Sequence, residues 1–230
     1  MSFSGLQTYL MCPQKFKYGS IDKVQSEFTP QALAFGSAIH DALESYYRSD
    51  KKISPDMMAN ILRNGLTDEA IRFEDSVDDF VAKGKELLTM AVEMPVGTII
   101  GSEVPVEIPV TDDFTIIGRI DLLTEENGQT VITDFKTAGK KPSQTDVDGN
   151  LQLTTYSIAY PDSIQRIRAL VKSAHSHTVD LTTSRTDADR SRVIKMFTGV
   201  KDAIESGAFY PNTSWACAGC QYYKRCHKEF

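Results

Sequence analysis

Two aspartates and a lysine flank a short polar turn in the segment GRIDLLTEENGQTVITDFKTAG, residues 118–139. The pair Asn127-Gly128 is a strong signal for a β-hairpin, because a two-residue type I′ turn needs positive φ at both central positions. Such a turn pairs residues whose numbers sum to 255, which sets Asp121 opposite Asp134. Because like charges that face each other across two strands repel, the segment predicts a cation between the two carboxylates.

A hard divalent cation, Mg²⁺ or Mn²⁺, fits such a gap, with water and a substrate phosphate completing its shell. Lys136 lies two residues beyond Asp134 and so shares its face of the strand. There its ammonium could orient a water and stabilise charge on a phosphoryl oxygen, while the cation lowers the pKa of the water. The alternative is a surface hairpin with ordinary charges. The apolar neighbours Ile120, Leu122 and Phe135 favour the metal site.

Four cysteines form a second group of chemically capable residues. Three of them follow a C-x2-C-x5-C spacing in CAGCQYYKRC, as Cys217, Cys220 and Cys226, and the fourth is Cys12. In a reducing cytosol, clustered thiols indicate a metal or redox site rather than disulfides. Four thiolates suit a structural zinc or a [4Fe-4S] cluster, and the spacing does not decide between them. The alternative for Cys12 is a small buried hydrophobe.

Composition places the chain among globular proteins without a membrane anchor. It has 230 residues, of which 41% are hydrophobic and 24% charged, and no apolar run approaches the ~20 residues of a membrane span. The beginning of the chain lacks the features of a secretory signal, so we expect the cytoplasm of a bacterium, an archaeon or a phage-infected host. The net charge of −6 argues against a protein that coats nucleic acid, but not against an enzyme with a local binding groove.

The hydrophobic period changes along the chain. Helical spacing covers residues 30–47, 55–73 and 77–93, so the region 1–95 is predicted to be mainly helical. Residues 98–110, 114–123 and 130–136 are rich in β-branched residues and predict three consecutive antiparallel strands. A helix is expected over 149–160, strand structure over 164–181, and an amphipathic helix from 187 that ends at Gly207.

These patterns predict one domain, residues 1–230, of mixed α/β class with helices that flank a central mixed sheet. Its parts are the helical region 1–95, a core at 96–206 and a segment 207–230 that holds the clustered cysteines together with Cys12. The sequence contains no G-x-x-x-x-G-K-[ST] phosphate loop, so no ATPase motor of that type is expected.

With these motifs the chain resembles the RecB-like nucleases of the PD-(D/E)XK superfamily, especially the iron–sulfur branch of the AddB nuclease domain and the CRISPR-associated RecB-like exonucleases. The resemblance runs from FSGLQTYLMCPQKFKY to CAGCQYYKRC. It implies a restriction-endonuclease-like core in which His40 of GSAIHDALE, Asp121 and Asp134 are metal ligands and Lys136 is the catalytic lysine. From the residues alone, His40 could equally be a core or capping histidine.

QLTTY is similar to the Q-x-x-x-Y motif of the family, which implies roles for Gln152 and Tyr156 beside the active site and the DNA. Their i,i+4 spacing puts them on one helix face, where they could also be a partly buried surface pair. Glu103 begins the strand before GRIDLL and could assist the metal, although no motif identifies it.

The same resemblance implies that Cys12, Cys217, Cys220 and Cys226 hold a [4Fe-4S] cluster. It implies a Mg²⁺- or Mn²⁺-dependent DNA exonuclease that acts on single-stranded DNA or DNA ends, with 5′-to-3′ preference, in CRISPR spacer processing, recombination or phage DNA metabolism. Protein partners would come from a recombination or CRISPR adaptation complex. The alternatives are a non-catalytic iron–sulfur module for DNA binding or assembly, and an endonuclease on the same fold.

Overall fold

The computed structural model describes residues 1–73 and 76–230. Residues 74 and 75, within the region predicted to be mainly helical, lie outside the described residues. The helical elements are α1 (Phe3–Met11), α2 (Pro13–Phe16), the π-helix η1 (Lys17–Ile21), α3 (Gln31–Arg48), α4 (Pro55–Gly65), α5 (Val77–Glu93), α6 (Gln144–Asp148), α7 (Leu151–Ala159), α8 (Asp187–Glu205), the 3-10 helix η2 (Trp215–Gly219) and α9 (Tyr223–Glu229). None of the helices in the described ranges has the length and apolar character that crossing a membrane requires.

A five-stranded mixed sheet forms the centre of the fold, as the sequence predicts. Its order is β3-β4-β5-β6-β7, and only the β5–β6 pair within it is parallel. The crossover between those two strands carries α6 and α7. The strands are β3 (Thr98–Thr111), β4 (Phe114–Glu126), β5 (Gln129–Ala138), β6 (Ile164–Val171) and β7 (His177–Thr183), and a separate short parallel pair joins β1 (Thr29–Pro30) to β2 (Ile71–Arg72).

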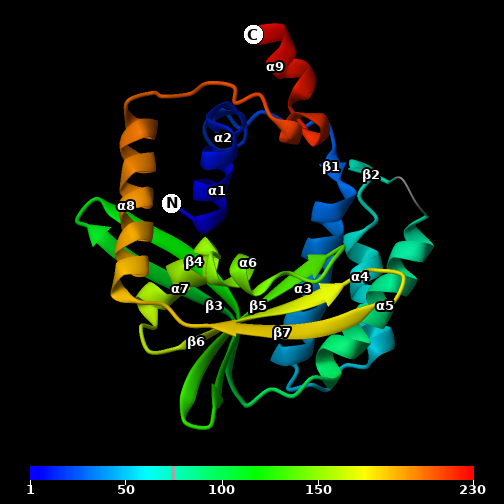
Figure 1. The fold of residues 1–230 in the computed structure, drawn as a ribbon. Coiled ribbons are helices and arrows are strands. Elements are labelled where there is room, and N and C mark those ends of the chain that lie inside the picture. Colours follow the sequence, from blue (N-terminus) through cyan, green and yellow to red (C-terminus); the bar gives the residue numbers. More distant parts are fainter. Residues whose placement is uncertain (74–75) are drawn as a thin grey trace.

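Helices cover both faces of the sheet (Figure 1). On one face α3, α4 and α5 bury residues such as Phe35 and Leu87 against Phe135 of the sheet. On the other face, α1, α7 and α8 pack over the strands, with Leu6 and Phe197 among the fully buried side chains. The sheet therefore separates two apolar cores, and the helices that supply predicted site residues, α3 and α7, approach it from opposite sides.

Local signals explain where several helices begin and end. Ser54 and Ser76 accept hydrogen bonds from backbone N–H groups in the first turns of α4 and α5, which is typical N-cap behaviour. A capping box of Thr186 and Asp189 starts α8. Gly207 follows the end of that helix with a φ of 73°, the left-handed conformation that glycine adopts without strain.

The Asn127-Gly128 turn has the predicted geometry, with φ values of 52° and 78°. The predicted register is confirmed from the turn, where residue 126 faces 129, as far as the pair of Leu122 and Thr133. The hydrogen-bonded pairing of β4 and β5 ends at that pair. The two aspartates lie one step farther on, where β4 and β5 part, so they flank a fork rather than face each other within the ladder.

Two sequence predictions are wrong in extent. The helix expected over 55–73 ends at Gly65, and residues 71–72 form β2 instead. A Cβ on Gly65 would lie 2.8 Å from the Cβ of Ala38. A glycine at the end of α4 therefore allows this helix to pack closely on α3. Beyond it the Asp68 carboxylate accepts a hydrogen bond from the Ala70 N–H and forms a turn. The strand structure expected over 164–181 is likewise two antiparallel strands, β6 and β7.

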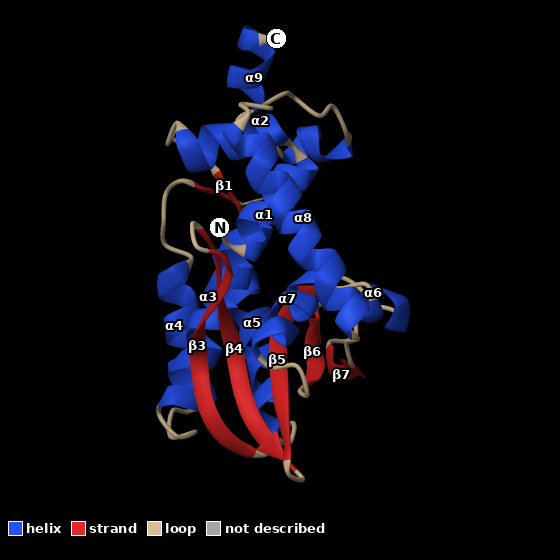
Figure 2. Ribbon diagram, turned by 90° about the vertical axis from the view of Figure 1, so that its left-hand side faces the viewer, coloured by secondary structure: helices blue, strands red, loops and turns tan. Residues whose placement is uncertain are grey.

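Hydrogen bonds tie the first helix to the segment that follows α8. The Tyr9 hydroxyl donates to the Ala208 carbonyl at 2.6 Å, and the Asn212 side-chain amide donates to the Met11 carbonyl at 2.9 Å. Figure 2 shows α2 and α9 together at one end of the molecule, away from the tip of the β4–β5 hairpin. The fold thus brings Cys12 into the same region as residues 207–230.

Arg168 provides a stability test of this fold. Its side chain is fully buried, donates twice to the Asp180 carboxylate, both at 2.8 Å, and also bonds backbone carbonyls at the end of α5 and just beyond it, those of Ala91 and Pro95. Arg168→Met removes the donor to these carbonyls and leaves Asp180 only its longer contact with Arg166 at 3.5 Å, so we expect it to lower the free energy of unfolding by about 3–5 kcal/mol. Urea denaturation measures the difference.

A matched control is Arg63→Met, because Arg63 makes an exposed ion pair with Asp78 at 2.8 Å. Exposed pairs contribute at most about 1 kcal/mol. Equal losses in the two variants would contradict a dominant role for the buried arginine.

Candidate active site

A cleft of about 750 Å³ opens where β4 and β5 part. Its walls come from the first turns of α1, from one face of α3, from β3, β4 and β5, and from α7. The predicted site residues that line it are His40, Asp121, Lys136, Gln152 and Tyr156. Asp134 is only 1% exposed and touches the cleft through Lys136. The fold therefore gathers all six predicted active-site residues in one place.

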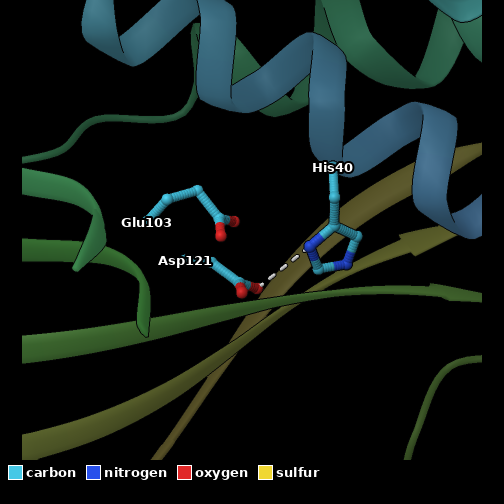
Figure 3. A group of neighbouring side chains, drawn as sticks. All are labelled: His40, Glu103 and Asp121. Atoms are coloured by element: carbon cyan, nitrogen blue, oxygen red, sulfur yellow. Dashed lines mark ion pairs between the residues drawn. The ribbon is translucent and has the colours of Figure 1, made fainter. Parts of the chain in front are cut away.

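Within the described residues, one group of potential metal ligands has its ligand atoms all within 4.8 Å of one another: His40, Glu103 and Asp121 (Figure 3). His40 reaches down from α3, and its Nδ1 lies 3.4 Å from Oδ2 of Asp121. One imidazole nitrogen and two carboxylates are a donor set that suits a divalent cation such as Mn²⁺ or Mg²⁺. The chemistry of these side chains therefore fits the predicted metal.

Burial lowers the pKa of His40, but the hydrogen bond and charge of Asp121, with the charge of Asp134, leave it above the ordinary value for histidine. The imidazole thus sits in a negative environment. The same field would attract a metal cation, which requires the neutral ring as ligand.

Glu103 is the member of the group that no sequence motif identified. Its φ is 53°, a left-handed conformation that is rare for a residue with a long side chain. The ladder between β3 and β4 pairs its neighbours Ser102 and Val104 with Leu122 and Ile120. Burial, followed by the charges of Asp121 and Glu44, raises the pKa of Glu103. Backbone strain of this kind concentrates at functional sites.

Asp121 is held at the fork by the backbone of the neighbouring strand. Its Oδ2 accepts a hydrogen bond from the Phe135 N–H at 2.7 Å, and the Ser102 hydroxyl donates to its carbonyl at 3.1 Å. The ring of His40 meets Phe135 edge-on, with the ring centroids 6.4 Å apart. The Asp121 side chain, which would otherwise rotate, is therefore fixed toward α3 and the cleft.

Asp134 and Lys136 form an ion pair on the next strand. The lysine Nζ donates to Oδ1 at 3.0 Å and lies 2.9 Å from Oδ2, but the second contact lacks hydrogen-bond geometry, which leaves Oδ2 buried without a hydrogen bond. Burial raises the pKa of Asp134, and the charge of Lys136 opposes that rise. Although Asp134 is outside the group of three, its orphaned oxygen is free to bind a cation, so its role as a ligand stays a prediction.

A line of hydrogen bonds runs from Lys136 into α7. Its Nζ donates to Oε1 of Gln152 at 2.8 Å, the Gln152 Nε2 donates to the Tyr156 hydroxyl at 3.0 Å, and that hydroxyl donates to the Arg119 carbonyl at 2.6 Å. Gly118 permits the last contact, because a Cβ there would lie 2.9 Å from the tyrosine ring. Gln152 and Tyr156 thus hold the lysine in place.

The four cysteines line a second cavity, of about 190 Å³, at the end of the molecule where α1 and residues 207–230 meet. All four are free thiols. In the described chain, no three of their sulfurs lie within 4.8 Å of one another. Burial, followed by the charges of Cys12, Cys220 and Cys217, raises the pKa of the Cys226 thiol. The predicted ligands therefore share one cavity, but they do not form a closely gathered group.

The family model of the PD-(D/E)XK nuclease superfamily matches residues 1–227, nearly the whole chain. The chain therefore belongs to the PD-(D/E)XK nuclease superfamily. Nucleases of this superfamily use divalent metals, which agrees with the donor set of His40, Glu103 and Asp121.

One solved structure shares the fold at low sequence identity. A protein from Eubacterium rectale described as a "Putative exonuclease" superposes with a TM-score of 0.62 at 12% identity, over 100% of this chain and 88% of that chain. The structure of SSO0001 covers 99% of each chain at 14% identity, but its TM-score of 0.40 is too low to carry an argument. No curated protein sequence matches the chain.

The potential metal ligands His40, Glu103 and Asp121 predict measurable affinity for a divalent cation. His40→Ala and Glu103→Ala each remove one donor, so we expect each to weaken Mn²⁺ binding at least ~10-fold, which is the lower limit for the loss of supporting groups around a metal. Isothermal titration calorimetry without DNA measures this directly. The control is Asp41→Ala, an exposed carboxylate that lines the cleft outside the group. If Asp41→Ala weakens binding as much as Glu103→Ala, the metal is held elsewhere in the cleft.

Proposed function

We propose that the protein is a Mg²⁺- or Mn²⁺-dependent deoxyribonuclease that removes nucleotides from the ends of single-stranded DNA, with 5′-to-3′ preference. The observation that carries the proposal is the single cleft that combines a metal-ligand group with a lysine held by Asp134 and Gln152. Membership of the nuclease superfamily supports phosphodiester hydrolysis, and the name of the structural neighbour supports exonuclease action.

The proposed mechanism assigns a separate task to each side chain. His40, Glu103, Asp121 and, as predicted from the sequence, Asp134 would hold the divalent ion, which when bound supplies Lewis acidity and lowers the pKa of a water. Burial lowers the pKa of Lys136, but Asp134 and Asp121 raise it overall, so the lysine is charged. Its Nζ, fixed by Asp134 and Gln152, is placed to orient a water and to stabilise charge that develops on a phosphoryl oxygen.

Apolar side chains in the cleft support single-stranded DNA as the substrate. Leu33 of α3 is 57% exposed and Ile117 of β4 is 48% exposed, and both line the cleft. In a single strand the bases are free to contact apolar groups beside the reacting phosphate, whereas in a duplex they are paired and stacked.

The cysteine cavity is proposed to hold a [4Fe-4S] cluster through Cys12, Cys217, Cys220 and Cys226. A tetrahedral zinc site with Zn–S bonds of about 2.3 Å brings its thiolates within roughly 3.8 Å of one another. No three of these sulfurs lie within 4.8 Å in the described chain, so the thiolates would have to move together to hold one zinc ion, and the cluster rather than zinc is proposed because of the family resemblance. The contacts of Tyr9 and Asn212 around the cavity suggest that the cluster would clasp distant parts of the chain.

A nuclease of this kind, without a motor of the phosphate-loop type in its own sequence, would act on strands that other proteins expose. CRISPR spacer processing, recombination and phage DNA metabolism all supply such strands, and proteins of those complexes are the proposed partners. Four free thiols suit the reducing cytoplasm of a bacterium, an archaeon or a phage-infected host.

Lys136→Ala tests the proposed chemistry. Because the lysine stabilises the transition state and is not a metal ligand, we expect kcat to fall by about 10²- to 10³-fold with Mn²⁺ affinity unchanged. Hydrolysis of end-labelled single-stranded DNA in Mg²⁺ or Mn²⁺ measures the rate. The matched control is Lys140→Ala, an exposed lysine four residues along the chain, for which wild-type turnover is expected. Wild-type activity in Lys136→Ala would remove the role given to Lys136.

The same assay separates the competing activities. A strand labelled at either end reports the direction of cleavage, and a covalently closed single-stranded circle reports endonuclease action. Hydrolysis of the circle at the linear rate would replace the exonuclease proposal with an endonuclease. If the purified protein hydrolyses neither substrate with either metal, the non-catalytic DNA-binding module becomes the better description.

The cluster proposal predicts the composition of protein purified without oxygen. Such protein should be brown and contain about four iron atoms and about four acid-labile sulfides per chain. Cys12→Ala should lose both and also unfold at lower temperature, because binding energy at a site formed by distant residues is folding energy. Stoichiometric zinc without sulfide would contradict the cluster.

A further inference from the structure

Exposed apolar side chains concentrate around the cysteine cavity. The region is made of two segments, residues 1–21 and 207–230, here called the terminal module. It contains seven of the eleven large apolar residues that are exposed among the described residues, including Leu10, Met11, Tyr210 and Trp215. Because exposed apolar groups that gather in one region mark binding surfaces, this module has a surface that the catalytic cleft does not explain.

The charge of the same module is opposite in sign to that of the rest of the chain. It carries five lysines and arginines (Lys15, Lys17, Lys224, Arg225 and Lys228) and one acidic residue, Glu229, for a net charge of +4, whereas the whole chain has −6. In the part of the chain that the structure describes, neither Lys15 nor Lys228 lies within ion-pair distance of a carboxylate. This surface therefore suits an anionic partner that also presents apolar faces.

Trp215 is the most exposed of these side chains, at 87%. It is the only tryptophan of the sequence and begins η2, the helix that carries Cys217. In the described residues its ring makes no aromatic or cation–π contact. An indole left in water in the same module as lysines without a carboxylate partner matches the combination of stacking ring and positive charge that binds single-stranded nucleic acid.

Helix α1 of the module runs from the catalytic cleft toward the exposed apolar residues. Phe3, Ser4 and Gln7 at its beginning line the cleft, and Leu10 and Met11 at its end are exposed. The carbonyl of Met11 accepts a hydrogen bond from Asn212, three residues before Trp215. The nine residues of α1 span ~13 Å at 1.5 Å each, which is the length of about four stacked nucleotides.

We infer that the terminal module is a second binding site for single-stranded DNA, in which a base stacks on the Trp215 indole while Lys15 and Lys228 contact phosphates. A strand with its reacting phosphate in the cleft would run along α1 and reach this site about four nucleotides away. The inference rests on the proposed function for the direction of the strand, but not for the binding itself. It makes affinity depend on strand length.

Fluorescence of the single tryptophan tests the contact in the intact protein. Lys136→Ala protein in Mg²⁺, at one fixed low salt concentration, is titrated with oligo-dT of ~20 and ~4 nucleotides. Trp215 emission should be quenched by the long strand and much less by the short one. Trp215→Ala should weaken binding of the long strand roughly 10-fold, as the loss of one stacked base predicts, and leave the short one unchanged. Trp215→Phe should retain most of the affinity.

The control is Met57→Ala, an apolar side chain of α4 that is 52% exposed and lies outside the module, for which wild-type affinity is expected. Fluorescence anisotropy of labelled DNA gives an independent measure of saturation. Unquenched emission at saturation together with wild-type affinity of Trp215→Ala would overturn the inference and assign the surface to a protein partner. Quenching of Lys136→Ala, together with wild-type protein that fails to cleave DNA, would keep this inference and reject the proposed nuclease activity.

Discussion

The removal of two carboxylates from water is the constraint on which the rest of the site depends. Asp134 is 1% exposed and Asp121 is 8% exposed, and buried charges persist only when they are paired and hydrogen-bonded. Lys136 forms an ion pair with Asp134, while the Phe135 N–H donates a hydrogen bond to Asp121 and His40 lies within ion-pair distance of it. Lys136 and Phe135 belong to β5 and His40 belongs to α3, so the site forms only when the sheet and this helix are assembled together.

The helix that steadies Lys136 is itself fixed by a buried cation. Arg185, just before α8, donates to the Thr154 hydroxyl at 2.6 Å, to the Val147 carbonyl at 2.8 Å and to the Asn150 carbonyl at 3.2 Å. These acceptors surround the start of α7, two residues from Gln152. Two successive sets of hydrogen bonds, from Arg185 to the start of α7 and from α7 to Lys136, therefore restrict the position of the lysine.

Sequence patterns were sufficient where local rules govern the structure. The Asn127-Gly128 turn set the hairpin register, and i,i+4 spacing placed Gln152 beside Tyr156. They failed where tertiary packing decides. The left-handed φ of Glu103 lies within β3, between residues that pair with Leu122 and Ile120 of β4, and has no local signal. The end of α4 at Gly65 lies against Ala38 of α3, a contact that helical spacing does not reveal. The hairpin register predicted Asp121 to face Asp134, but the pairing ends one step earlier, and the Asp121 carboxylate instead accepts a hydrogen bond from the Phe135 N–H.

The hydrogen bond between Tyr9 and Ala208 has a consequence for the order of assembly on the ribosome. A chain is made from its amino end, and contacts between residues this far apart in sequence form late. Helix α1, which forms one wall of the cleft, has to wait for almost two hundred further residues before it meets this partner. The far end of this wall of the cleft is therefore anchored only when nearly the whole chain has left the ribosome.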